Sequence, residues 1–514
     1  MPVYQAGQLN TTALQAPDLY VIIQPPGVAY INGVPTDGLG LVGVGSWGPV
    51  NAAVMGIGNN AQAQQAVGGV QFRSHDLATA VAVAVQNNVQ NIVLVRVSDG
   101  TDIAASVAVK DTASTPVTGM TLTALYSGTV GNTITAAVVA GTANNTFKLS
   151  LQRAGFTPEV YDNIAGSGAT FWANAVQAVN FGQSGVRGPS QLVVATIGTS
   201  AAAPNVTATY SMIGGTDGAG GVTDASLVGT DGLTRSGMYA LRKSGVQVGN
   251  LVDCQTPTTW TAQLAFGLQE GIYFHSANPP GTSVTTSASN LATAGIDGYG
   301  LMCLVGDWAY WQDNTNGVQR MLSPATFTSA LQAATSPQNS ILNAPIGGVI
   351  ATQRSLQNLP YSGAEIGQIA SSRLDVLTLG APAGPIFACR TGRNVSSNSG
   401  TNGDNYTRMT NYLAFTMAAA FGYVPGKPQT IDLRRNVKGA MDAFFANLQQ
   451  AKMIGNVNNP SAPAWSVQID ANNNPFSQVA LGYMQANIMV TYLSIVRYFL
   501  VNIQGGQSVT VTPI

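Results

Sequence analysis

The sequence predicts a multidomain α+β protein: an α/β core layer, an all-β domain inserted into that layer, and a C-terminal α+β module. Three observations predict this class. Strand and helix patterns alternate over residues 39–97 and again over 237–390. Between them, residues 102–210 are dense in glycine, threonine, alanine and serine, with short apolar runs between turns. From Ile431 onward, one amphipathic helix precedes several strand patterns.

The length of 514 residues agrees with several domains rather than a single core. We divide the chain into an N-terminal arm (1–32), the first part of the α/β domain (33–101), the inserted β domain (102–212), the second part of the α/β domain (213–385), a C-terminal module (386–504) and a C-terminal arm strand (505–514).

Charge is scarce in this chain. Charged residues make up 8% of the sequence and the formal net charge is −1, whereas a soluble domain carries about 25% charged residues. Such totals neither keep copies of the chain apart nor attract it to nucleic acid or to an anionic membrane. The composition fits a subunit that is buried among its neighbours. The alternative is a neutral, secreted, β-rich protein.

The first elements form the start of the α/β layer. A short apolar strand pattern (Leu19, Tyr20, Val21, Ile22, Ile23) comes before it and stops at Pro25, Pro26 and Gly27. Residues 39–44 read as a buried strand, 60–67 and 75–86 as helices, and 91–97 as a second buried strand.

The inserted domain and the rest of the layer follow. Strand patterns at 107–109, 134–139, 147–151 and 192–195 make the insertion all-β, and the glycine-rich segment 214–221 is the joint where it ends, more readily a hinge than a phosphate loop. The layer resumes with helices expected over 237–243, 259–270, 324–334 and 410–421, and with strands over 246–252, 272–275, 300–311, 374–379 and 386–390.

The C-terminal module begins with an apolar helical stripe that should end at Gly455. The stripe comprises Val437, Met441, Phe444, Phe445 and Leu448. Strand patterns follow over 465–469, 484–492 and 495–503, then a flexible joint at Gly505 and Gly506. The last strand (Ser508, Val509, Thr510, Val511, Thr512) has no hairpin partner after it. An unpaired strand behind a glycine joint needs the edge of a sheet to join, and if that edge belongs to another subunit the result is β-augmentation.

A catalytic or cofactor site receives little support. The two histidines, His75 and His275, lack metal-ligand spacing, and the three cysteines, Cys254, Cys303 and Cys389, resemble reduced core thiols. Cys254 and His275, with Asp253 beside the cysteine, are one possible nucleophile pair, but nothing local in the sequence would activate the thiol. We expect no enzyme activity, no cofactor and no metal.

The C-terminal helix carries a group of cations that stands out in a chain so poor in charge. Arg434, Arg435, Lys438 and Lys452 face only Asp432 and Asp442. They are either a solvated helix face or a docking surface for an acidic partner, and both interpretations stay open. The N-terminus shows no secretory pattern and the apolar runs are interrupted, so we expect cytoplasmic synthesis and no membrane insertion.

Motifs along nearly the whole chain together resemble the tail sheath proteins of contractile bacteriophages. They are, in order, Pro26 to Val28 with Val42 to Asn51 (VGVGSWGPVN), Ile92 to Val97 (IVLVRV), Ser127 to Val138, Met212 to Gly218 (MIGGTDG) and Ala388 to Gly392 (ACRTG). The proline usual between Tyr310 and Trp311 is absent here, and residues 323–348 match only loosely.

The resemblance implies a virion protein that is assembled in the host cytoplasm and forms stacked hexameric rings around a tail tube. Its partners would be copies of itself, the tube protein, and the baseplate and tail terminator proteins. Strands from neighbouring subunits would complete the C-terminal module, which faces the tube, while the inserted domain faces outward. From this resemblance we assign the two arms to residues 19–23 and 508–512, and the arm hinges to Pro25–Gly27 and Gly505–Gly506. A bacteriocin or secretion-system sheath, or a static coat or adhesin, remains the alternative.

Overall fold

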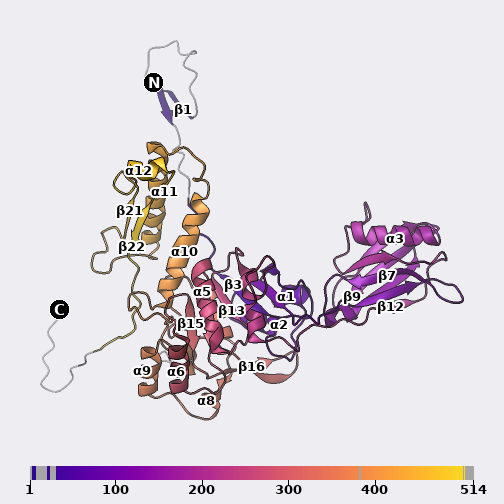
Figure 1. The fold of residues 1–514 in the computed structure, drawn as a ribbon, viewed down its shortest axis with the longest axis horizontal. Helices are drawn as coiled ribbons and strands as arrows, with labels where there is room; N and C mark the ends of the chain where they lie inside the picture. The colour runs from indigo at the N-terminus through magenta and orange to yellow at the C-terminus, as the bar shows by residue number, and fades with distance from the viewer. Residues whose placement is uncertain are drawn as a thin grey trace. The chain divides into compact units, whose positions relative to one another are not determined.

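The computed structural model describes residues 3–6, 20–23, 31–380, 382, 384–501 and 503, the first two ranges by their backbone only (Figure 1). The chain divides into two compact units, which we describe separately. The main unit comprises the described parts of Pro35–Asn411 and Ile495–Ile514, and the C-terminal unit those of Met1–Val34 and Tyr412–Ser494. The boundary near residue 412 falls inside a helix.

A six-stranded sheet forms the centre of the main unit, in the order β15-β14-β13-β3-β5-β4. Five strands are parallel and β4, at one edge, is antiparallel to β5. The strands are β3 (Gly38–Val44), β4 (Ala53–Ile57), β5 (Asn91–Val97), β13 (Val248–Leu251), β14 (Tyr273–Ala277) and β15 (Leu301–Leu304). The predicted buried strands at 39–44 and 91–97 are confirmed.

Both faces of this sheet are covered, which explains why its strands are continuously apolar rather than alternating. Leu39 and Leu41 pack into a hydrophobic core on one face of the sheet. Val42 and Val44 pack into a second core on the opposite face. The helices are α1 (Asn60–Val67), α2 (Leu77–Gln86), α4 (Asp224–Val228), α5 (Trp260–Glu270), α6 (Val284–Ala294) and α7 (Pro324–Ala334), with 3-10 turns η3 (Gly237–Leu241) and η4 (Pro257–Thr259).

Glycine in β3 permits a close approach of the chain. A β-carbon on Gly43 would collide with the carbonyl oxygen of His75 and would touch Leu77 at 3.3 Å. The amide of the next residue, Val44, donates to that same His75 carbonyl at 2.7 Å. Gly40 and Gly43 therefore belong to a closely packed strand.

The inserted segment forms two further sheets, in the orders β10-β9-β8-β12 and β11-β7-β6. Their strands are β6 (Ser106–Lys110), β7 (Thr118–Ala124), β8 (Ile134–Ala140), β9 (Thr146–Arg153), β10 (Glu159–Ala165), β11 (Val193–Ile197) and β12 (Thr209–Ser211), with a 3-10 turn η2 (Thr129–Thr133). The expectation of an all-β insertion is wrong at one place, because α3 (Ala169–Phe181) is a helix. Its buried residues Phe171, Trp172, Ala175, Ala178 and Val179 have helical spacing, which the sequence analysis overlooked.

The remainder of the main unit consists of short elements. The strand predicted over 300–311 is in fact two strands, because the chain turns at Gly306 and Asp307 between β15 and β16. The elements are β16 (Ala309–Asp313), β17 (Val318–Leu322), β18 (Ala351–Thr352), β19 (Leu377–Leu379), β20 (Phe387–Cys389), α8 (Gln353–Leu356) and α9 (Gly363–Ser371).

The C-terminal unit contains the second half of α10 (Asp404–Phe421), then α11 (Ile431–Gln450), β21 (Trp465–Gln468), α12 (Phe476–Ala480) and β22 (Asn487–Val490), drawn in orange to yellow in Figure 1. Helix α11 ends at Gln450 and not at Gly455 as predicted. The amide of Gly455 instead donates to the carbonyl of Thr491 at 3.1 Å, so this glycine pairs with the chain that follows β22.

Candidate functional site

The C-terminal unit is organised by the apolar stripe of α11. Thr430 caps the helix by accepting from the amide of Leu433, and the predicted stripe is buried. Phe445 is fully buried and stacks on Trp465 of β21 at 6.5 Å between ring centroids. The indole of Trp465 donates to Asp442 at 3.1 Å, and Lys438 forms an ion pair with the same carboxylate at 2.6 Å. The helix therefore fixes β21 by both packing and polar contacts.

The sheet that α11 supports has only two strands among the described residues. β21 and β22 are antiparallel, with Trp465 opposite Val490 and Val467 opposite Ile488. Packing against α11 supports this small sheet. A strand at the edge of a sheet presents a row of backbone donors and acceptors.

The connection between β21 and β22 exposes apolar side chains that the sequence analysis did not single out. Asn473 and Asn474 donate to the carbonyl of Gln485 at 3.1 and 2.9 Å and so close the base of the connection. Beyond that base, Phe476, Leu481 and Tyr483 are all exposed. The pattern Pro475-Phe476 within a polar stretch could have indicated an exposed apolar turn.

The apolar run at 495–503 does not form the strand that we predicted. Its described residues have no regular structure. Val496, Tyr498, Phe499, Leu500, Val501 and Ile503 are between 60% and 87% exposed. Such a continuous exposed apolar segment is unusual on a soluble monomer. The periodicity of the run was strand-like, but the described chain offers it no sheet to join.

The N-terminal strand is confirmed as β2 (Tyr20–Ile23), and it pairs in parallel with β1 (Val3–Ala6) of the same chain. The sequence analysis gave no strand before residue 19. Leu19, the joint at Pro25–Gly27, the joint at Gly505–Gly506 and the strand at Ser508–Thr512 lie outside the described residues.

The four predicted cations do not form one compact cluster. Arg434, Arg435 and Lys438 lie in the first half of α11, and Lys452 follows the other end of the helix. The helical rise separates Arg435 from the end of the helix by roughly 20 Å. Lys438 is neutralised by Asp442, whereas Arg435 and Lys452 are exposed. The cations therefore span the helix and are unequal in their availability to a partner.

The possible cysteine nucleophile is not activated in this fold. Burial raises the pKa of the Cys254 thiol to about 12. Its sulfur lies 3.4 Å from the hydroxyl of Thr259, and it is 2% exposed. His275 is also buried, which lowers its pKa to about 3, and its Nδ1 lies 2.9 Å from the hydroxyl of Thr328. Both side chains are core residues with local partners.

Within the described ranges, no three His, Cys, Asp or Glu side chains gather as a metal-binding group. No helix in the described part of the chain is long and apolar enough to cross a membrane.

The sequence matches no protein-family model, and no curated protein is similar to it in sequence. Solved structures share its fold, however. The sheath tail protein of Listeria innocua has a TM-score of 0.59 at 14% identity, over 85% of this chain and 89% of that one. The sheath tail protein of Desulfitobacterium hafniense has a TM-score of 0.55 at 15% identity, over 88% and 94% of the two chains.

The sheath of an extracellular contractile injection system (PVC), in its contracted state, has a TM-score of 0.55 at 9% identity over 97% of this chain and 99% of that one. These likenesses extend over nearly the full length of each chain. The protein therefore has the mixed α+β, multi-sheet fold of the contractile tail sheath proteins.

Proposed function

We propose that this protein is the structural subunit of a contractile tail sheath, which polymerises as stacked hexameric rings around a tail tube and contracts to drive the tube through a host envelope. The observation that carries the proposal is a sheath-like fold whose small β21–β22 sheet has two strands, in a chain that also exposes an apolar segment at 496–503. Each copy would supply strands to a neighbour and receive strands in return.

Strand exchange gives a physical basis for such a polymer. A heterologous interface that does not close on itself generates a helix of subunits. Main-chain hydrogen bonds between exchanged strands persist while the subunit bodies rotate, provided that the joints beside the strands bend. We assign the exchanged strands to residues 19–23 and 508–512, and the joints to Pro25–Gly27 and Gly505–Gly506.

Contraction then needs no nucleotide. The extended sheath would be metastable, held by the tube and the baseplate, and its release would let the bodies repack with more buried contact. Small gains for each subunit add up over many subunits. On this account the protein is not an enzyme, and its partners are other copies of itself, the tube protein, the baseplate and the tail terminator.

We place the tube contact on the cations of α11. Arg435 and Lys452 are exposed, and Arg434 and Lys438 lie beside Arg435 on the helix. In a chain with 8% charged residues, these cations favour an acidic surface on the tube.

A second candidate is the sheath of an extracellular injection system rather than of a phage. The likeness to the contracted PVC sheath covers more of this chain than the likeness to the Listeria innocua protein, 97% against 85%. Both candidates would form a polymer that contracts. They differ in whether the particle carries a capsid. A static coat or adhesin, by contrast, would need no exchanged terminal strands.

Deleting Gln507–Ile514 tests the proposal. Under conditions in which the full chain polymerises, we expect the truncated chain to stay folded by circular dichroism and monomeric by light scattering. Val511→Pro should reproduce the defect because proline removes a backbone donor, whereas Val511→Thr keeps strand propensity and serves as the matched control. Normal tubes from the truncated chain would refute strand exchange by this arm.

A further inference from the structure

The inserted domain is joined to the α/β layer by two segments that pair with each other. The amide of Asp99 donates to the carbonyl of Gly218 at 2.8 Å. Ile103 and Thr216 exchange both of their backbone hydrogen bonds, at 3.1 and 3.0 Å. The amide of Gly221 donates to the Asp99 carboxylate at 2.7 Å. The glycine-rich return segment 214–221 is thus a paired strand connection, although its composition predicted a hinge.

One carboxylate in this connection binds both domains. Asp217 forms an ion pair with Arg73 of the α/β layer at 2.7 Å and accepts from the hydroxyl of Ser46 at 3.0 Å. Its other oxygen accepts from the amide of Thr129 in the inserted domain at 2.6 Å. Burial alone would raise the pKa of Asp217, but these hydrogen bonds and Arg73 outweigh burial and hold the pKa below its ordinary value.

A buried arginine of the central sheet reinforces the same place. Arg96 on β5 is 1% exposed. It donates to the carbonyls of Gly48 at 2.9 Å, Ser127 at 2.7 Å and Asp217 at 3.1 Å. The first carbonyl belongs to the α/β layer, the second to the inserted domain and the third to the connection, so one planar guanidinium ties all three together.

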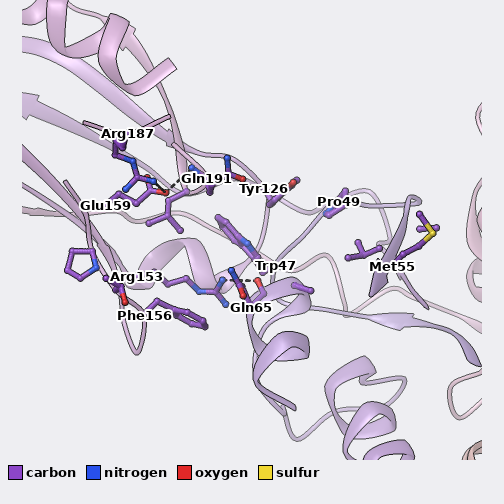
Figure 2. A pocket seen from close by; sticks show the side chains of 16 residues that line it. Trp47, Pro49, Met55, Gln65, Tyr126, Arg153, Phe156, Glu159, Arg187 and Gln191 are labelled. Carbon is purple, nitrogen blue, oxygen red and sulfur yellow. Dashed lines mark hydrogen bonds and ion pairs between the residues drawn. The ribbon is translucent and has the colours of Figure 1, made fainter. Parts of the chain in front are cut away.

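A third arginine, Arg153 of the inserted domain, attaches that domain to the α/β layer at a separate place. Arg153 of β9, in the inserted domain, donates to the carbonyls of Gln65 at 2.9 Å and Gln64 at 2.5 Å in the last turn of α1. A cation is favoured there by the helix dipole. Its guanidinium lies 4.4 Å from the ring centre of Phe156 and 5.4 Å from that of Trp47, and Figure 2 shows this arrangement.

Arg153 lines a cleft of about 840 Å³ between the α/β layer and the inserted domain. Trp47, Pro49 and Met55 line it from the α/β layer, and Tyr126, Phe156 and Arg187 from the inserted domain (Figure 2). Trp47 packs edge-on against Tyr126 at 5.3 Å. The cleft is therefore bounded by fixed contacts and is preformed.

We propose that Arg73, Arg96 and Arg153 clamp the inserted domain to the α/β layer, so that the two domains move as one rigid body and the glycine-rich connection does not act as a hinge. The clamp involves a single chain and does not depend on the proposed polymer. In a contracting assembly, the clamp would transmit a force applied to one domain to the other domain, because the connection between them would not bend.

Distance measurements between two spin labels test this proposal. The three natural cysteines are buried, so Ala173→Cys on α3 and Ser289→Cys on α6, both at exposed positions, can be labelled selectively. The test variant combines Asp217→Asn with Arg153→Met. The first change removes the Asp217 carboxylate that binds Arg73. The second removes the hydrogen bonds of Arg153 to α1 and keeps an unbranched side chain at that position. The matched control is Arg187→Met, whose ion pair with Glu159 at 3.0 Å lies within the inserted domain.

We expect one narrow distance distribution for the parent chain and for the control, and a distribution at least twice as wide for the test variant. A broad or split distribution in the parent chain would overturn the proposal. So would an unchanged width in a test variant that retains its circular dichroism spectrum. If the double variant does not fold, Arg153→Met alone is judged by the same criteria.

Discussion

Several of the few charged residues of this chain are buried and hold its loops in place. Asp375 is completely buried and accepts from the amides of Arg390 at 3.0 Å, Thr391 at 2.9 Å and Gly392 at 2.8 Å. Gly392 has a φ of 55°, a left-handed conformation that favours glycine. These contacts give the segment Ala388–Gly392, recognised as a motif in the sequence, a structural role as a carboxylate-bound loop.

A second buried carboxylate should make stability depend on pH. Burial raises the pKa of Asp404 to about 6, and the nearby charge of Asp375 raises it too. Hydrogen bonds from Ile341, Ser340 and Asn405 act in the opposite direction. A raised carboxyl pKa favours the fold at low pH. Stability should therefore be lost as the pH rises from about 4 through about 6, by roughly 3 kcal/mol at most.

Urea unfolding of the parent chain and of Asp404→Asn at several pH values checks this expectation. The variant should gain stability relative to the parent as the pH rises from 4.5 to 7. Parallel pH profiles for the two proteins would show that Asp404 does not titrate in this range.

The three thiols should be inert in the folded protein. Cys254, Cys303 and Cys389 are all buried, and burial raises the pKa of each thiol. We expect no reaction with an aromatic disulfide reagent under native conditions and reaction of all three in urea. Rapid native labelling of Cys254 would revive the nucleophile hypothesis, and Cys254→Ala would then separate catalysis from packing.

At the level of elements, one aromatic pair joins α11 to the β21–β22 sheet. Phe445→Ala should cost about 3–5 kcal/mol, because the phenyl ring is fully buried against Trp465 and leaves a cavity. Ala443→Ser, on the exposed face of the same helix, is the matched control and should change stability little. Chemical denaturation measures both, and equal stability of the two variants would mean that the ring contributes little.

Elements with a clear period could be predicted from the sequence, and elements that depend on distant partners could not. The stripe of α11 and the apolar strand β3 were correct because each is specified by its own residues. Residues 495–503 looked like a strand, yet a strand needs a neighbouring edge that the described chain does not provide. The contacts of the glycine-rich joint were not predicted, because Arg73, which binds Asp217, lies far away in sequence.

The candidate site was predictable to a similar extent. The N-terminal strand was found where the sequence placed it, but its pairing with β1 was not expected. The exposed apolar residues around Phe476 were missed, although Pro475-Phe476 within a polar stretch could have indicated them. The tube contact predicted at Arg434, Arg435, Lys438 and Lys452 stays a prediction, and the length of α11 separates Lys452 from the other three cations.

At the scale of the whole molecule, three features fit the proposal that copies of the chain assemble. Low charge removes repulsion between copies, the small C-terminal sheet has two described strands, and an apolar segment is exposed. The clamped inserted domain would make each subunit body rigid. These properties suit a subunit of a polymer.

Negative-stain electron microscopy of the purified full chain, alone and with its tube protein, tests the central claim most directly. We predict long, striated, hollow tubes, formed by the chain alone or around added tubes. Particles that stay monodisperse and leave added tubes bare would contradict the sheath assignment and would favour a static coat or adhesin.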